Sequence, residues 1–180
     1  LAIYLHLRGR PRAAVLAATT AALFHPTYLL GALSLDAAFV FVALRRRHHL
    51  REATHVALTA AISLLPITLY ALLTFAATTP ATQQQAQHLI VASRIPFHAI
   101  PARWLDKGAY LQLGLVVLGL IFVRRSRLLT LLAIPFFVAL ALTLVQIVAP
   151  RDGLALLFPW RISIFLVPLA SALILGWIVV

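Results

Sequence analysis

Long apolar stretches separated by short polar segments are the main feature of the chain. They cover residues 13–24, 27–44, 54–76, 108–123, 128–148 and 161–180. An α-helix needs about 20 mostly apolar residues to cross about 30 Å of hydrocarbon, and most of these stretches come near that length. Their positions do not alternate between apolar and polar, as they do in the strands of a membrane β-barrel. The pattern therefore predicts an all-α, polytopic transmembrane helical bundle with about six membrane helices, forming a single domain over residues 1–180.

The stretch from residue 13 to residue 44 is interrupted by His25-Pro26 and allows two arrangements. Proline disfavours helical geometry in the residue before it and lacks a backbone donor, so the chain forms either one kinked helix or a helical hairpin. The flanks 8–12 and 45–51 are both basic. The positive-inside rule places both flanks in the cytoplasm, which only a hairpin allows. We therefore expect a hairpin, whose first arm is short or re-entrant because residues 13–24 cover only about 18 Å.

Composition supports a membrane location and excludes nucleic acid as a partner. Hydrophobic residues make up 63% of the chain, and the net charge is +11 at pH 7. The arginines cluster between apolar stretches, as the positive-inside rule requires, and no basic face is interleaved with base-stacking aromatic residues. Three clusters are therefore predicted to be cytoplasmic, namely 8–12, 45–51 and 124–127. The His25 turn and the loops 77–107 and 149–160 are predicted to lie on the other side.

The longest polar loop, residues 77–107, holds most of the candidate site. Thr79-Pro80 supplies an N-cap and an N1 proline, which predicts a short helix over 81–93 that ends before Pro96. The loop then gathers Arg94, His98 and Arg103, followed by Trp104. Arginine offers a fork of donors that suits phosphate, and histidine suits proton transfer or a metal. In the alternative interpretation, arginine and tryptophan only anchor this loop at lipid headgroups.

Acidic residues near these cations have several expected partners. Arg161 begins the last apolar stretch, where an arginine opposes the helix dipole, so we expect an anion beside it, either a lipid phosphate or Asp152. Asp106 is placed to pair with Arg103 or Lys107. Asp36 lies well inside a predicted span, where carboxylates are either functional or paired with a buried group. The sequence leaves both alternatives open for Asp36.

Histidines and cysteines give no sign of a metal or redox centre. His25, His88 and His98 lie on the same predicted side, and three histidines can form a metal site. Their spacing matches no compact ligand motif, so no metal site is predicted. Cysteine is absent, which excludes a disulfide framework and a thiolate site. The sequence identifies no cofactor.

Three short segments carry a resemblance to known proteins. They are Phe24-His-Pro-Thr-Tyr28, Arg94-Ile-Pro-Phe-His98 with Pro101 and Trp104, and Pro159-Trp-Arg-Ile-Ser163. Together they resemble a group of uncharacterised bacterial polytopic membrane proteins, which are similar to the GT-C class of lipid-linked-sugar glycosyltransferases. That group often shows Arg-x-Pro-His-His, and here Phe97 stands in place of the first histidine.

The resemblance implies a membrane glycosyltransferase of the bacterial inner membrane that acts at the non-cytoplasmic face. It would move a sugar from a polyprenyl-phosphate donor, with Arg94, Arg103 and Arg161 holding the phosphate. His98 or His25 would orient that phosphate. In GT-C enzymes an acidic motif of the first external loop is central to catalysis, and this sequence contains no such motif to which a catalytic role can be assigned.

A non-enzymatic function is the second hypothesis, because the sequence has no clear pair of carboxylates. The chain would then be a lipid or glycan transporter, or a structural subunit of a larger complex with other membrane proteins. Under both the enzymatic and the non-enzymatic hypothesis, the chain is expected to contact membrane lipids. Because the sequence begins and ends within apolar stretches, we expect it to be a fragment of a longer protein.

Overall fold

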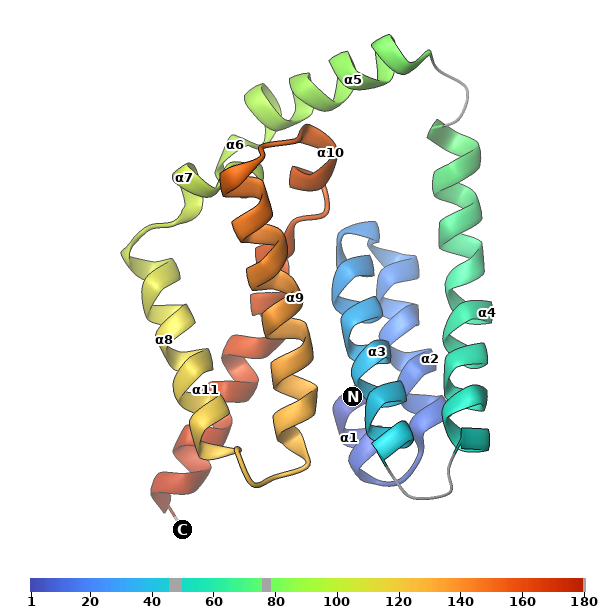
Figure 1. Cartoon of the computed structure of the whole chain (residues 1–180), viewed down its shortest axis with the longest axis vertical. Coiled ribbons are helices and arrows are strands. Elements are labelled where there is room, and N and C mark those ends of the chain that lie inside the picture. The colour runs from blue at the N-terminus through green and yellow to red at the C-terminus, as the bar shows by residue number, and fades with distance from the viewer. Residues whose placement is uncertain (46–49, 76–78, 180) are drawn as a thin grey trace. The chain divides into compact units, whose positions relative to one another are not determined.

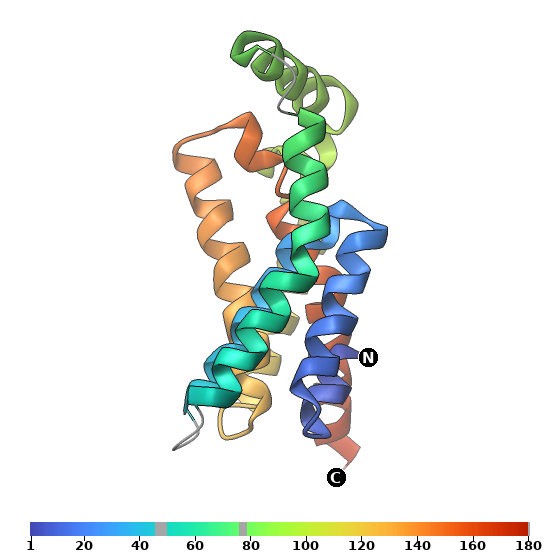
Figure 2. The ribbon, with the colours of Figure 1, turned by 90° about the vertical axis from the view of Figure 1, so that its right-hand side faces the viewer.

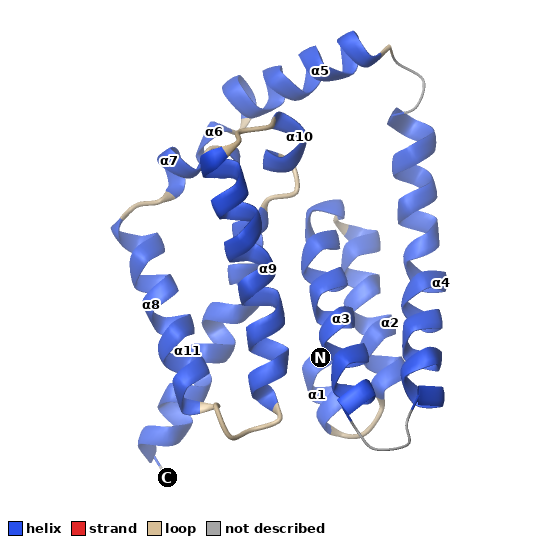
Figure 3. Cartoon of the chain, viewed as in Figure 1, coloured by secondary structure: helices blue, strands red, loops and turns tan. Residues whose placement is uncertain are grey.

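The computed structural model describes residues 1–45, 50–75 and 79–179, and these are helical with no strand (Figures 1 and 3). They form two compact units, Leu1–Ala76 and Ala77–Val180. The all-α prediction is therefore confirmed for the described residues. The assignment of one domain to the whole chain stays a prediction, and the two units are described separately below.

Among the described residues, four helices are long and apolar enough to cross a membrane. They are Pro26–Arg45, Leu50–Thr74, Leu128–Val148 and Asp152–Val179. These helices identify an integral membrane protein, but the expected number of about six spans is not confirmed. Pro11–Phe24 and Lys107–Phe122 have 14 and 16 residues. At 1.5 Å per residue they reach only about 21 and 24 Å, less than the thickness of the hydrocarbon core.

The first unit is built around the helical hairpin that the sequence predicts. Its elements are α1 (Ala2–Leu7), α2 (Pro11–Phe24), the 3₁₀ turn η1 (Pro26–Tyr28), α3 (Leu29–Arg45) and α4 (Leu50–Phe75). Helix α2 ends at His25, whose extended backbone (φ −146°, ψ 106°) is the conformation that a following proline favours. Helices α2 and α3 then lie side by side (Figures 1 and 2). The hairpin is confirmed, and the alternative of one kinked helix is wrong.

Small side chains let the helices of this hairpin approach closely. Ala18 and Ala22 of α2 pack against Ala32 of α3 in a buried cluster. At the other end of α2, Nη2 of Arg12 lies 3.0 Å from Nδ1 of His55, near the start of α4. The basic segment 8–12 therefore lies at the same end of the unit as the start of α4, as a hairpin requires. Residues 46–49 of the second basic cluster lie outside the described residues, and the cytoplasmic location of this end stays a prediction.

The second unit contains three long helices and several short ones. The long helices are α8 (Lys107–Phe122), α9 (Leu128–Val148) and α11 (Ser163–Val179). The short elements are α5 (Pro80–Leu89), the π-helical turn η2 (Ile90–Arg94), α6 (Pro96–Ala99), α7 (Pro101–Trp104), α10 (Asp152–Ala155) and the 3₁₀ turn η3 (Pro159–Ile162). Helices α8 and α11 cross closely at Gly119, where an added Cβ would lie 2.8 Å from Cβ of Ala170.

Four of the short elements of the second unit, α5, α6, α7 and α10, lie at one end of α9 (Figure 1), and η3 packs against α9. The arginine-rich turn 124–127, which joins α8 to α9, lies at the other end. We name residues 79–106 and 150–162 the polar layer. The turn 124–127 and the polar layer thus lie at opposite ends of α9, and the side of the membrane that each faces stays a prediction.

Local signals in the sequence explain where the short helices begin and end. The backbone N–H of Thr82 donates to Oγ1 of Thr79 at 3.3 Å, and Pro80 follows that cap, so α5 starts where the sequence predicts. The helical run passes through η2 and breaks at Ile95, directly before Pro96. Asp106 has a role that the sequence did not predict. Its Oδ1 accepts a hydrogen bond of 2.8 Å from the backbone N–H of Ala109, so it caps α8.

Candidate functional site

A small hydrophobic cluster holds the two halves of the polar layer together. Val91 of η2 and Ala99 of α6 pack against Ala155 of α10, and all three are buried. Ile95, Ile100 and Leu156 pack around them. Segments that are far apart in the sequence are thereby fixed against one another, and the polar side chains that they carry stand on a common support.

Two stacked tryptophans make a second connection within the layer. The rings of Trp104 in α7 and Trp160 in η3 lie 5.7 Å apart between centroids and are nearly parallel, with an interplanar angle of 9°. Each tryptophan is next in sequence to a predicted phosphate-binding residue, Arg103 and Arg161. The stack therefore brings the turns that carry these two arginines together. Trp104, for which lipid anchoring was the alternative interpretation, is half-buried and stacks on Trp160.

The turn before Arg161 has an unusual backbone. Phe158 has φ 47° and ψ 59°, a left-handed conformation that costs a non-glycine residue about 1–2 kcal/mol. Pro159 then starts η3, and the guanidinium carbon of Arg161 lies 5.6 Å from the centroid of the Phe158 ring. The ring supports the cation from one side. Strained residues of this kind are concentrated at binding sites, which makes this turn part of the candidate site.

The other predicted site residues occupy exposed positions. Arg94 ends η2, His98 lies in α6, and Arg103 lies in α7, and the side chains of all three are exposed. His25 belongs to the first unit, at the turn between α2 and α3, where its Nδ1 lies 2.8 Å from Oγ1 of Thr27. The convergence of these residues on one phosphate stays a prediction.

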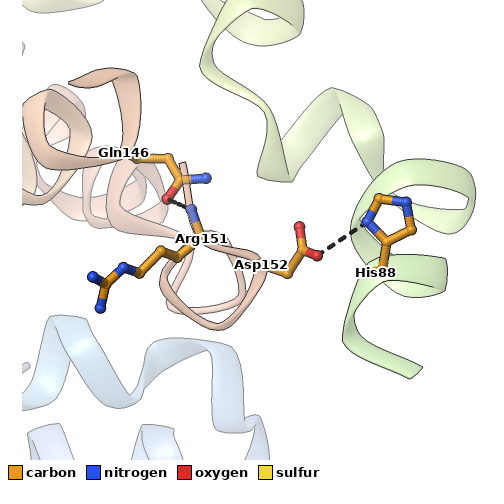
Figure 4. Close-up of polar contacts among 4 residues, drawn as sticks. All are labelled: His88, Gln146, Arg151 and Asp152. Carbon is orange, nitrogen blue, oxygen red and sulfur yellow. Dashed lines mark hydrogen bonds and ion pairs between the residues drawn. The ribbon is translucent and has the colours of Figure 1, made fainter. Parts of the chain in front are cut away.

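A histidine–aspartate pair joins α5 to α10 and was not predicted. Nδ1 of His88 lies 3.1 Å from Oδ2 of Asp152 (Figure 4). The neighbouring backbone N–H of Arg151 donates to Oε1 of Gln146, a buried residue in the last turn of α9, at 3.2 Å. These two bonds hold the start of α10 from two sides. Figure 4 also shows the guanidinium of Arg151 pointing away from His88.

The sequence offered Asp152 as one of two anions for Arg161, the other being a lipid phosphate, and in the structure Oδ2 of Asp152 lies within hydrogen-bond distance of His88. The two residues are 64 positions apart, so no spacing within a helix or a loop indicated the pair. The sequence indicated only that the two loops that carry these residues lie on the same side of the membrane. Of the residues that the structure describes, no three histidine, aspartate or glutamate side chains lie close enough to hold a metal ion.

Comparison of the chain with protein-family models, with curated proteins and with solved structures finds no match in any of the three. The functional argument therefore depends on the residues of the chain. The polar layer offers arginine donors, a histidine–aspartate pair and stacked aromatic rings above three apolar helices. Chemically, such a layer can bind a ligand that has an apolar tail, an anionic group and polar substituents.

Proposed function

We propose that the chain is part of a GT-C-like membrane glycosyltransferase that acts on a polyprenyl-phosphate-linked sugar at the non-cytoplasmic face of the bacterial inner membrane. The observation that carries the proposal is the Trp104–Trp160 stack, which brings the turns of Arg103 and Arg161 together above apolar helices. A lipid-linked sugar has matching parts, because its polyprenyl chain dissolves in the bilayer and its phosphate lies at the membrane surface.

In this proposal the arginines of the polar layer bind the phosphate. Arg94, Arg103 and Arg161 each offer a planar fork of N–H donors, which forms charge-assisted hydrogen bonds with phosphate oxygens. Transfer of the sugar leaves negative charge on the phosphate, and fixed cations beside it stabilise that charge as it develops. His98, which lies in the same unit as these arginines, orients the same group. The support is the position of the arginines on packed turns, together with the resemblance of their segments to the GT-C-like group.

The non-enzymatic alternative is favoured by the state of the two carboxylates in the polar layer. Asp106 is engaged as the cap of α8, and Asp152 is bonded to His88. Both carboxylates therefore have partners other than a second carboxylate. A transporter of the same lipid, or a structural subunit that binds it, needs the arginines but no such pair.

Binding of polyprenyl phosphate to the chain in lipid nanodiscs tests the proposal. The Arg94→Ala, Arg161→Ala double variant is expected to lose about 1.5–3 kcal/mol for each charge-assisted hydrogen bond that it removes, which is more than tenfold in affinity. The matched control is the Arg125→Ala, Arg127→Ala double variant, which removes the same charge at the opposite end of α9. Equal affinity of both double variants and the unaltered chain would overturn the proposal.

Release of polyprenyl phosphate from the sugar-linked lipid distinguishes an enzyme from a transporter. An enzyme supplied with an acceptor frees the phosphate, whereas a transporter or a structural subunit binds the lipid without cleaving it. The measurement follows the lipid product over time in the same nanodiscs.

A further inference from the structure

A hollow of about 760 Å³ lies between α5 and α10 in the second unit. Gln84, Gln87 and His88 line it from α5, and Arg151, Asp152 and Leu154 line it from the opposite side. The volume is in the range of pockets that hold small molecules. None of the five residues that the sequence predicted as a site is among those that line the hollow, so it adds a second set of polar groups to the polar layer.

The groups around the hollow form a balanced mixture of donors and acceptors. Each glutamine amide offers one acceptor oxygen and two N–H donors, and Asp152 offers acceptor oxygens. The carboxylate of Asp152 borders the hollow and disfavours a bound anion, whereas the guanidinium of Arg151 points away from His88 (Figure 4). Leu154 adds an apolar surface. A neutral molecule whose hydroxyl groups both donate and accept, and whose C–H groups are apolar, complements this lining.

The walls of the hollow are held in place without the ligand. Asp152 contacts His88 at hydrogen-bond distance, and the backbone N–H of Arg151 beside it donates to the buried Gln146. The amide of Gln87 lies over Gly153, since a Cβ added to that glycine would be 3.5 Å from Oε1 of Gln87. The absence of a side chain at residue 153 leaves room beside the amide. Groups that are already positioned lose less entropy when a ligand binds.

We propose that this hollow binds a neutral saccharide. The inference rests on the proposed function for its biological setting, because the saccharide is then either the sugar of the lipid-linked donor or part of the glycan that accepts it. The chemistry of binding is independent of that setting, since it depends on the amides and the carboxylate that line the hollow and does not depend on Arg94 or Arg161.

Saturation-transfer NMR on the full chain in lipid nanodiscs measures the binding directly. The probes are methyl glycosides of glucose, mannose and N-acetylglucosamine, and detergents with sugar headgroups are left out because they would compete. Gln87→Ala is expected to weaken binding about tenfold, as the loss of hydrogen bonds predicts. Gln83→Ala is the matched control, because Gln83 is on the same helix and does not line the hollow. This control is expected to bind like the unaltered chain.

Gly153→Leu provides a variant that leaves every polar group in place. Gly153 does not have a positive φ, and its added Cβ would meet only an ordinary contact, so the turn can accept the side chain while the leucine fills the hollow. Loss of saccharide binding in both Gly153→Leu and Gln87→Ala, with binding kept in Gln83→Ala, supports the proposal. Absence of saturable binding by all three probes overturns it, as does equal binding in these three variants.

Arginine variants separate this proposal from the proposed function. If Arg94→Ala, Arg161→Ala keeps binding of the methyl glycosides and of polyprenyl phosphate, the proposed function fails and the saccharide site stands. If polyprenyl phosphate binding depends on the arginines while no glycoside binds, the saccharide site fails alone. Binding of the sugar-linked lipid distinguishes the two sources of the saccharide, because Gln87→Ala weakens it only if the hollow holds the sugar of the donor.

Discussion

Replacing Gly119 by alanine is expected to force helices α8 and α11 apart. An alanine Cβ at this position would lie 2.8 Å from Cβ and 3.1 Å from Cα of Ala170. The second of these atoms is backbone, so no side-chain rotation relieves the contact. Overpacking of this kind costs about 1–3 kcal/mol, while replacement of glycine by alanine within a helix gains about 0.5–1 kcal/mol.

Gly114 is the matched control for this prediction, because it lies in the same helix and an added Cβ there meets nothing within 4 Å. Gly114→Ala therefore gains only about 0.5–1 kcal/mol, the amount that replacement of glycine by alanine adds to helix stability. The free energy of unfolding of Gly119→Ala is therefore expected to lie about 1–3 kcal/mol below that of Gly114→Ala. Reversible unfolding in mixed micelles, followed by circular dichroism, measures the difference. Ala170→Gly should restore part of the loss in a double variant. Equal stability of the two alanine variants would refute the close crossing.

Three further predictions address the caps, the buried carboxylate and the topology. Asp106→Ala is expected to lower the free energy of unfolding by about 1 kcal/mol through loss of the α8 cap, whereas Asp106→Asn keeps the cap and should cost little; an equal loss in both would indicate a charge pair instead. Asp36→Ala is expected to leave the stability unchanged or raise it, because neither carboxylate oxygen has a hydrogen-bond partner among the described residues, and a loss above about 1 kcal/mol would reveal a partner. The chain has no native cysteine, so Ser93→Cys should react with an impermeant label outside intact cells and Ser126→Cys only after permeabilisation; the reverse pattern would invert the topology.

Helix starts and breaks were predictable where a local signal determines them. The break at His25-Pro26 follows from the conformation that proline imposes on the residue before it, and α5 starts at a threonine cap followed by proline. The number of spans was not predictable from apolar length alone. Apolar residues continue near both ends of α8, but the cap at Asp106 and the turn after Phe122 restrict the helix to 16 residues.

Contacts between segments that are distant along the chain could not be predicted from the sequence. His88 and Asp152 are polar residues in separate surface segments, which are brought together by the packing of Val91 and Ala99 on Ala155 and by the stack of Trp104 on Trp160. The pair itself is exposed, with 68% of the His88 side chain and 34% of the Asp152 side chain accessible. A pair so exposed is worth little to stability, so folding alone imposes no strong requirement for it. The pair is of interest because both of its residues line the hollow between α5 and α10.

For Asp36 the sequence left two alternatives open, a functional carboxylate or one that is paired with a buried group. A carboxylate within a membrane span is either functional or balanced by a buried partner. Asp36 is 3% exposed, and both of its oxygens are buried without a hydrogen-bond partner among residues 1–45, 50–75 and 79–179. The ring of His6 stacks on Phe39, three positions after Asp36 and therefore on the same side of α3. Hydrogen bonding within the described residues therefore does not offset the cost of burying this carboxylate, and the stability of Asp36→Ala tests whether another group does.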